Sequence, residues 1–291
     1  MTDHLDCHFI AEVSSNHGRD LNRCLEFVDA SSSAGFDSVK FQVFQISKLF
    51  APEVVDSRED IRQRANWELP LEFIPAISER CKARGLKFGV TPFFLEAVEF
   101  CAPYVDYFKI ASYELLWTDL LDECLRMGKP IISSTGMATL AEIDAVAKIL
   151  KNKNFDDWTL LHCVSNYPCQ MSDVNLAAIS TLRERYGCSI GWSDHSKLEA
   201  VILNAVLAWN ASVVEMHFDL DGNGAEFAPG HCWLPHESKA VIDLCRSRSI
   251  CNGNGEKKPS ESELFERSWR ADPVDGLRPM NETRCRLFDK K

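Results

Sequence analysis

The chain has 291 residues, 45% of them hydrophobic, and a formal net charge of −11. This length and apolar content are enough for one large buried core, and α/β barrels of this size are common as single domains. The acidic charge argues against nucleic acid or an anionic membrane as partner, because both bind basic surfaces. No apolar run reaches the roughly 18 residues of a membrane span.

The cysteines and the first residues bear on the cellular compartment. The start, "MTDHLDCHFIAEV", is acidic and leads directly into a strand-like run, unlike a secretory signal peptide. The 12 cysteines are scattered without a CxxC pair, and several lie in apolar runs, such as Cys24, Cys101 and Cys163. We therefore expect reduced thiols that fill the core of a cytoplasmic protein.

Eight short apolar or β-branched runs recur along the chain, and each is followed by a stretch with helical periodicity. Near-continuous apolar character is typical of strands buried on both faces, as in a parallel sheet. In chain order the predicted strands are "HFIAEVSS" (8–15), "SVKFQVF" (38–44), "KFGVTPF" (87–93), "YFKIAS" (107–112), "PIISST" (130–135), "TLLHCVS" (159–165), "SIGWSDH" (189–195) and "VVEMHF" (213–218).

Helix signals fill the segments between these strands. In "DLNRCLEFVDASSSAG", Leu21, Leu25 and Val28 follow helical spacing. The segment "TLAEIDAVAKIL" opens with Thr139 and Glu142 as a capping box. Four glycines stand where a left-handed turn ends a helix before the next strand: Gly35, Gly85, Gly128 and Gly187.

Eight strand–helix units predict a (β/α)8 TIM barrel, an α/β fold, formed by residues 1–250. An open, doubly wound sheet is the alternative, but the stretches "GNGAEFAPG" and "GNGEKK" do not join a strand to a helix as a phosphate-binding turn does. Residues 251–291 are polar and rich in turn-forming residues. We expect them to be a short C-terminal extension of a single domain.

Polar residues stand at the C-terminal ends of all eight predicted strands. In a barrel these ends meet at one mouth, where chemistry occurs. One such residue could be a helix cap, but polarity on every strand indicates a functional mouth. The residues are Glu12, Lys40, Gln42, Thr91, Lys109, Ser112, Glu114, Ser134, Thr135, Tyr167, Ser193, His195, Glu215 and His217.

The stretch "IGWSDHS" places a serine, an aspartate and a histidine side by side. Strand side chains alternate faces, so Ser193 and His195 point one way and Asp194 the other, which excludes a relay among the three. His195 and His217 end neighbouring strands instead. Two imidazoles with oxygen ligands suit Mn²⁺ or Mg²⁺, and a metal-free histidine pair is the alternative.

Lys40 and Lys109 are predicted to point into the barrel, where an ammonium is costly unless it meets an anion or acts as a nucleophile. With Ser112, Ser134 and Ser193 nearby, two cations and three hydroxyls form a cradle for phosphate. A Schiff base on one lysine, as in barrel aldolases, is a competing interpretation. A third interpretation is structural: the two lysines extend along the barrel wall to reach solvent at its rim.

The chain resembles the N-acetylneuraminate (sialic acid) synthase family. The resemblance runs in family order from about Phe9 to Phe218 through "IAEVSSNHGRDLNRCLEFVDASSSAGFDSVKFQVF", "FGVTPF", "FKIAS", "KPIISSTGM", "LLHCVSNYPC", "IGWSDHS" and "VVEMHF". It implies a metal-dependent condensation of phosphoenolpyruvate (PEP) with an N-acyl aldose similar to N-acetylmannosamine. The products are a nonulosonic (sialic-type) acid and inorganic phosphate.

The resemblance also implies roles for the polar strand ends. The implied PEP-binding residues are Lys40, Lys109, Ser112, Ser134 and Ser193. The implied metal ligands are His195 and His217, and the residues near the sugar or the reacting centre are Glu12, Gln42, Thr91 and Tyr167. Glu114 or Glu12 is expected to take the proton of the water that attacks C2 of PEP.

The sequence differs from the family pattern at positions expected near the acceptor sugar. In the family, a C-terminal antifreeze-like (SAF) domain lends an arginine to a partner's active site. We expect this chain to lack that domain, and Arg270 and Arg278 are candidates to replace the arginine. Ser165 stands in place of an asparagine. A Gly-Pro-Asp stretch is replaced by "GNGAEFAPGHCWLPHE", which offers three candidate residues, Glu226, His231 and Trp233. We expect small-molecule substrates, a homodimer and an acceptor other than N-acetylmannosamine.

Two other functions are compatible with the sequence. A Schiff-base aldolase or lyase would use Lys109 or Lys40 and would need no metal. A catalytically silent homologue would bind a sugar phosphate and act as a partner or regulator, although every acid, base and ligand position carries a chemically competent residue.

Overall fold

The computed structural model describes residues 7–288. Its eight strands are all parallel and pair in chain order, with β8 closing against β1. This closed sheet confirms the predicted barrel and excludes the open, doubly wound alternative. The strands are β1 (His8–Glu12), β2 (Ser38–Val43), β3 (Lys87–Pro92), β4 (Tyr107–Ile110), β5 (Ile131–Ser134), β6 (Trp158–Cys163), β7 (Ser189–Asp194) and β8 (Val213–His217).

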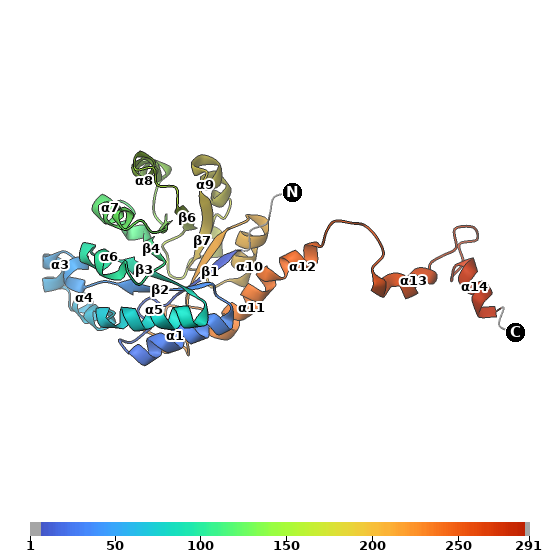
Figure 1. Cartoon of the computed structure of the whole chain (residues 1–291), viewed down its shortest axis with the longest axis horizontal. Coiled ribbons are helices and arrows are strands. Elements are labelled where there is room, and N and C mark those ends of the chain that lie inside the picture. Colours follow the sequence, from blue (N-terminus) through green and yellow to red (C-terminus); the bar gives the residue numbers. More distant parts are fainter. Residues whose placement is uncertain (1–6, 289–291) are drawn as a thin grey trace. The chain divides into compact units, whose positions relative to one another are not determined.

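Helices follow the strands and surround the sheet (Figure 1). The helices between strands are α1 (Leu21–Ala34), α5 (Ile74–Arg84), α6 (Leu95–Cys101), α7 (Thr118–Arg126), α8 (Leu140–Asn152), α9 (Ala178–Tyr186) and α10 (Glu199–Leu203), which a π-helical turn, η5 (Asn204–Ala208), continues. Helix α11 (Pro235–Arg246) follows β8. Two 3₁₀ turns lie after β4 and β6, η3 (Ser112–Glu114) and η4 (Met171–Asp173).

A cluster of short helices lies between β2 and α5, and the sequence pattern does not predict it. Phe44, Ile46 and Ile61 form a small hydrophobic core of their own there. The elements are α2 (Ile46–Leu49), α3 (Pro52–Ser57), α4 (Glu59–Gln63), η1 (Arg64–Trp67) and η2 (Leu71–Phe73).

The local signals at helix ends act as predicted. Thr139 and Glu142 form the capping box of α8, which satisfies two backbone N–H groups at its N-terminus. Gly35 adopts a left-handed conformation with a φ of 90° at the end of α1. Helix α1 confirms the helical spacing of Leu21, Leu25 and Val28, and Leu21 and Leu25 lie at its half-buried edge. Its buried face consists of Cys24, Phe27, Val28, Ser31 and Ala34.

The core has two layers. The large layer fills the space between the sheet and the helices. A smaller cluster inside the barrel contains Ile10, Tyr107, Ile132, Leu161 and Val213. These residues precede the polar strand ends on β1, β4, β5, β6 and β8, so they close the barrel beneath the mouth.

The chain divides into two compact units, Met1–Arg248 and Ser249–Lys291. The sequence pattern places this boundary at residue 250. Helix α12 (Arg248–Asn252) begins at the last residue of the first unit. The second unit contains the rest of α12, η6 (Glu261–Glu263), α13 (Leu264–Ser268) and α14 (Asn281–Phe288). All 12 cysteines are free and most are buried. Among residues 7–288, no helix is long and apolar enough to cross a membrane.

Candidate active site

Strand register brings the polar strand ends together at the mouth. Glu12 at the end of β1 pairs with Lys40 of β2 on one side and with His217 of β8 on the other. Ser193 of β7 pairs with Glu215 of β8. Since side chains alternate along each strand, the residues of this ring share the inner face of the barrel.

Lys40 lies at the centre of a buried ionic network. Its side chain is only 3% exposed, and its Nζ lies 2.5 Å from Glu12 Oε2 and 3.7 Å from Glu215 Oε2. Nζ also donates to Thr91 Oγ1 at 2.8 Å. Gln42 Nε2 donates to the other oxygen of Glu12 at 2.6 Å. Although burial favours loss of the proton, Glu12 and Glu215 raise the pKa of Lys40, so it remains an ammonium.

Lys109 is equally buried but has weaker compensation. Its Nζ donates to Ser134 Oγ at 2.7 Å and lies 3.5 Å from Glu215 Oε1. Burial, opposed by Glu215 and assisted by the charge of Lys40, lowers the pKa of Lys109. The two lysines therefore differ in how readily each releases a proton.

Glu215 bridges the two lysines, and the sequence assigns it no role of its own. It also accepts a hydrogen bond from Ser193 Oγ at 3.2 Å. Burial alone would raise the pKa of this carboxyl, but Lys109 and Lys40 lower it to about 2. One feature of the sequence could have identified Glu215: it lies on the same strand face as His217, two residues earlier and therefore one layer deeper in the barrel.

Ser112 and Glu114 lie on η3, directly after β4. Ser112 Oγ accepts a hydrogen bond from Gly136 N at 3.0 Å, which ties this turn to the end of β5. One carboxylate oxygen of Glu114 is buried and has no hydrogen-bond partner in the described chain. Burial raises the pKa of Glu114 to about 7, against the lowering effect of Lys109. A carboxyl group with this pKa exchanges a proton near neutral pH.

His195 and His217 face each other across the ends of β7 and β8, with ring centroids 5.2 Å apart. His195 Nδ1 donates to the carbonyl oxygen of Val164 at 2.7 Å, so the lone pair is at Nε2. His217 Nδ1 is buried and makes no hydrogen bond within residues 7–288. Tyr167 packs on His195 with a centroid distance of 4.1 Å. The pair fits the expected metal ligands, because a backbone carbonyl orients one ring and the other has a buried, unpaired nitrogen.

Glu226, from the segment that follows β8, reaches this histidine pair. Its Oε1 accepts from Ser14 Oγ at 2.7 Å, and its Oε2 lies 3.7 Å from His217 Nδ1. Burial would raise the pKa of Glu226, but the nearby ring of His217 and the hydrogen bond from Ser14 lower it to about 2. Glu226 is therefore a carboxylate beside the histidine ring.

The stretch "SDH" is not a triad, as the alternation of strand faces predicts. Asp194 is fully buried away from the mouth, where Trp192 Nε1 and Trp233 Nε1 donate to it at 3.1 and 3.0 Å. It also accepts from the backbone of Ser196. Its role is to anchor the turn that carries His195.

The structure groups the predicted site residues in two sets. Around the lysines lie Glu12, Lys40, Gln42, Thr91, Lys109, Ser134 and Ser193. Around the histidines lie Tyr167, His195, His217 and Glu226. Thr91, expected near the sugar or the reacting centre, accepts a hydrogen bond from Lys40, and its role toward a substrate stays a prediction. Arg270 and Arg278 belong to the second compact unit, and their proposed substitution for a partner's arginine stays a prediction.

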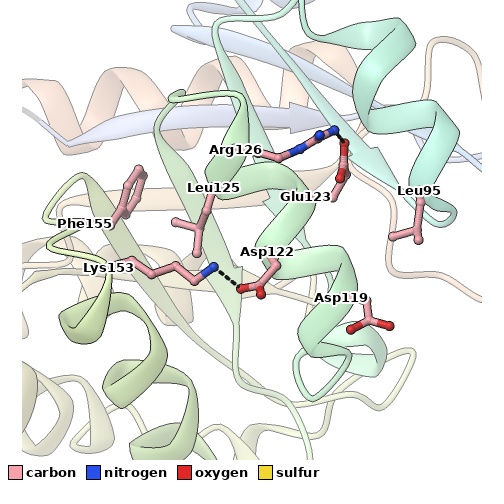
Figure 2. A pocket seen from close by; sticks show the side chains of 8 residues that line it. All are labelled: Leu95, Asp119, Asp122, Glu123, Leu125, Arg126, Lys153 and Phe155. Atoms are coloured by element: carbon pink, nitrogen blue, oxygen red, sulfur yellow. Dashed lines mark hydrogen bonds and ion pairs between the residues drawn. The ribbon is translucent and has the colours of Figure 1, made fainter.

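A separate surface pocket of about 480 Å³ lies on the outside of the barrel, between α6, α7 and α8 (Figure 2). Its lysine and arginine are already paired, Lys153 with Asp122 at 2.9 Å and Arg126 with Glu123. Asp119 adds a further negative charge to the lining. The pocket contains none of the strand-end residues, so it is distinct from the mouth.

Known proteins resemble this chain over most of its length. It is similar to an N,N'-diacetyllegionaminic acid synthase of Legionella pneumophila, 33% identical over 89% of this chain and 77% of the relative. A pseudaminic acid synthase of Campylobacter jejuni is 30% identical over 90% of this chain and 80% of the relative. The crystal structure of an N-acetylneuraminic acid synthetase from Leptospira borgpetersenii, in complex with citrate, superposes with a TM-score of 0.80 at 28% identity, covering 99% of this chain and 94% of that one. The model of the NeuB family matches residues 27–257. The chain therefore belongs to the NeuB family.

Proposed function

We propose that this chain is a PEP-dependent sugar-acid synthase. It condenses PEP with an N-acyl aldose, forming a nonulosonic acid and releasing inorganic phosphate. Relatives named for legionaminic, pseudaminic and N-acetylneuraminic acid support this class of product. The proposal includes a cytoplasmic, homodimeric enzyme that uses Mn²⁺ or Mg²⁺.

One observation carries the proposal: two buried lysines and a histidine pair share one barrel mouth. A buried ammonium is stable only beside an anion, and the two lysines have Glu12 and Glu215 as counter-charges. Ser134 and Ser193 add hydroxyls to the same layer. A phosphate ester of an enol with its own carboxylate is a ligand that such a cluster can bind at several points.

The geometry suggests how each residue acts. Lys40 and Lys109 hold the phosphate and carboxylate of PEP, while Ser134 and Ser193 orient it, so that its methylene carbon faces the aldehyde. A divalent cation at the histidines, when bound, polarises the aldehyde carbonyl. Carbon–carbon bond formation leaves positive character at C2 of PEP. Water adds there as Glu114 takes one of its protons, and the alkoxide formed from the aldehyde gains a proton. The tetrahedral intermediate then expels phosphate, which leaves with the proton of the C2 hydroxyl.

Phosphate release tests this function. The purified chain is incubated with PEP, MnCl₂ and a panel of N-acyl aldoses, including N-acetylmannosamine and diacetamido sugars. We expect phosphate release that depends on the acceptor. Tight PEP binding without turnover on any acceptor would instead support a catalytically silent sugar-phosphate-binding homologue.

Lys109 gives specific support to a second function, a Schiff-base aldolase or lyase. Its lowered pKa makes the neutral, nucleophilic amine more accessible than at Lys40. Borohydride added with a carbonyl ligand would then trap a covalent adduct, and chelators would leave activity unchanged. The synthase proposal predicts no adduct and loss of activity with chelators.

A further inference from the structure

The segment after β8 returns to the end of that strand and is held there by backbone hydrogen bonds. Phe218 and Trp233 form a parallel bridge. Trp233 N donates to the carbonyl oxygen of His217 at 2.7 Å, and Asp219 N donates to that of Trp233 at 2.9 Å. Gly230, with a φ of 93°, makes the turn before this bridge. These contacts fix the position of His231 beside the mouth.

His231 is a buried imidazole whose nitrogens have no hydrogen-bond partner among residues 7–288. It is 3% exposed. Most buried polar atoms in folded proteins are hydrogen-bonded, so a buried ring with two unpaired nitrogens needs an explanation. A bound ion supplies one, because a neutral imidazole nitrogen is a common metal donor.

The surroundings of His231 match a metal site. Its ring centroid lies 4.7 Å from that of His217, which is itself 5.2 Å from His195. Glu226 Oε2 lies 3.7 Å from His217 Nδ1 and 3.9 Å from His231 Nε2, too far for a hydrogen bond to either ring. A carboxylate oxygen thus stands between two imidazoles with space for a cation.

The spacing of the donor atoms places His231 beside His217. One donor atom each of His217, His231 and Cys232 lie within 4.8 Å of one another. Donors about 2.1 Å from one cation are separated by about 3 Å when adjacent and about 4.2 Å when opposite. A small contraction brings these atoms into that range.

His231 is a better candidate than Cys232 for the additional ligand. The Cys232 thiol already donates to the carbonyl oxygen of Glu226 at 3.3 Å, and Asn16 Nδ2 donates to its sulfur at 3.6 Å. The His231 nitrogens carry no such bonds.

We propose that His231 is a third protein ligand of the cation that binds His195 and His217, with Glu226 as the carboxylate of the site. This inference rests on the proposed function, which places a divalent cation at the histidine pair. Three imidazoles favour a transition metal such as Mn²⁺ over Mg²⁺, because Mg²⁺ prefers oxygen ligands. Mn²⁺ is therefore the cation expected to bind.

Metal binding without substrates tests the ligand set. The full chain is freed of metal, and Mn²⁺ affinity is measured by calorimetry and by the electron paramagnetic resonance signal of free Mn²⁺. His231→Gln is expected to weaken Mn²⁺ binding at least tenfold. His236→Gln is the matched control, since His236 is exposed on α11 in the same segment, and it should bind as the wild type does. Circular dichroism of each metal-free variant verifies folding.

The outcomes separate this inference from the proposed function. If His195→Gln and His217→Gln weaken Mn²⁺ binding but His231→Gln does not, the third-ligand assignment is wrong and the histidine pair stands. If Cys232→Ser weakens binding and His231→Gln does not, the thiol is the ligand and the assignment is likewise overturned. If the wild type binds no divalent cation, the metal role in the proposed function fails as well. Pulsed resonance of the Mn²⁺ complex should show one fewer coupled nitrogen in His231→Gln.

Discussion

Glu114 is a carboxyl group at the mouth that titrates near neutral pH. Because burial raises its pKa to about 7, it is protonated, and unable to accept a proton, in more acidic solution. We expect kcat/KM to fall as the pH is lowered through about 7. Glu114→Gln should lower kcat by about 10²- to 10⁴-fold and remove this acid limb. If kcat/KM of the variant still falls at acidic pH in the same way, another group is the proton acceptor, and Glu12 is the first to test.

Glu215 is expected to be the most important single residue for stability at the mouth. Its removal leaves Lys109 without its carboxylate and Lys40 with one fewer. Glu215→Gln should therefore cost about 3–5 kcal/mol of unfolding free energy, as when one member of a buried ion pair is removed. Urea unfolding at pH 7 measures the loss. If Glu215→Gln were as stable as the wild type, Glu215 would not be the stabilising counter-charge of the two lysines.

The pH dependence of that loss has a definite sign. The pKa of Glu215 is about 2 in the folded chain and about 4.3 for an unfolded glutamate. Its contribution is therefore complete above about pH 4.3 and is lost as the pH falls through about 2. The stability difference between the wild type and Glu215→Gln should narrow as the pH is lowered below about 4. A constant difference down to pH 3 would show that the carboxylate charge is not responsible.

Helix α8 offers a test of the scaffold that leaves the mouth intact. The Thr139 side chain and the Glu142 carboxylate cap its first turn on the protein surface. Thr139→Ala should reduce stability by about 1 kcal/mol, measured by urea unfolding, with unchanged kcat and KM. If Thr139→Ala lowered kcat/KM as well as stability, α8 would be coupled to the site. No hydrogen bond of Thr139 among the described residues reaches the mouth.

The elements differ in how far the sequence specified them. All eight strands were predictable because both of their faces are buried, which makes them mainly apolar apart from the polar residues near their C-terminal ends. The spacing of Leu21, Leu25 and Val28 was enough to predict helix α1 but not its buried face, because Leu21 and Leu25 are apolar although they lie at its edge. The short helices between β2 and α5 have no regular period. Their structure depends on a small local core around Phe44 and Ile61.

The candidate site likewise has one part that could be predicted from the sequence and one part that could not. Strand ends and side-chain alternation were enough to bring Lys40, Lys109, His195 and His217 to one mouth. The position of His231 was not predictable from spacing. It depends on a segment of about a dozen residues that returns to β8 through backbone hydrogen bonds, which leave no periodic signal.

The charge balance of the mouth predicts that PEP and the cation bind together. Two lysines stand against the carboxylates Glu12, Glu215 and Glu226, so the site has no positive charge to spare for an anion. Removal of the metal with a chelator should weaken PEP binding at least tenfold by calorimetry, because the substrate brings two or more negative charges. Equal PEP affinity with and without Mn²⁺ would contradict this balance.

The barrel as a whole places two buried lysines and a histidine pair at the same end of one closed sheet, where we propose that PEP and a cation bind. A crystal structure of the chain with PEP and Mn²⁺ tests that arrangement most directly. We predict the PEP phosphate or carboxylate within hydrogen-bonding distance of Lys40 and Lys109, and Mn²⁺ on His195 and His217. PEP bound away from both lysines, or a carbonyl carbon joined covalently to Lys109, would contradict it.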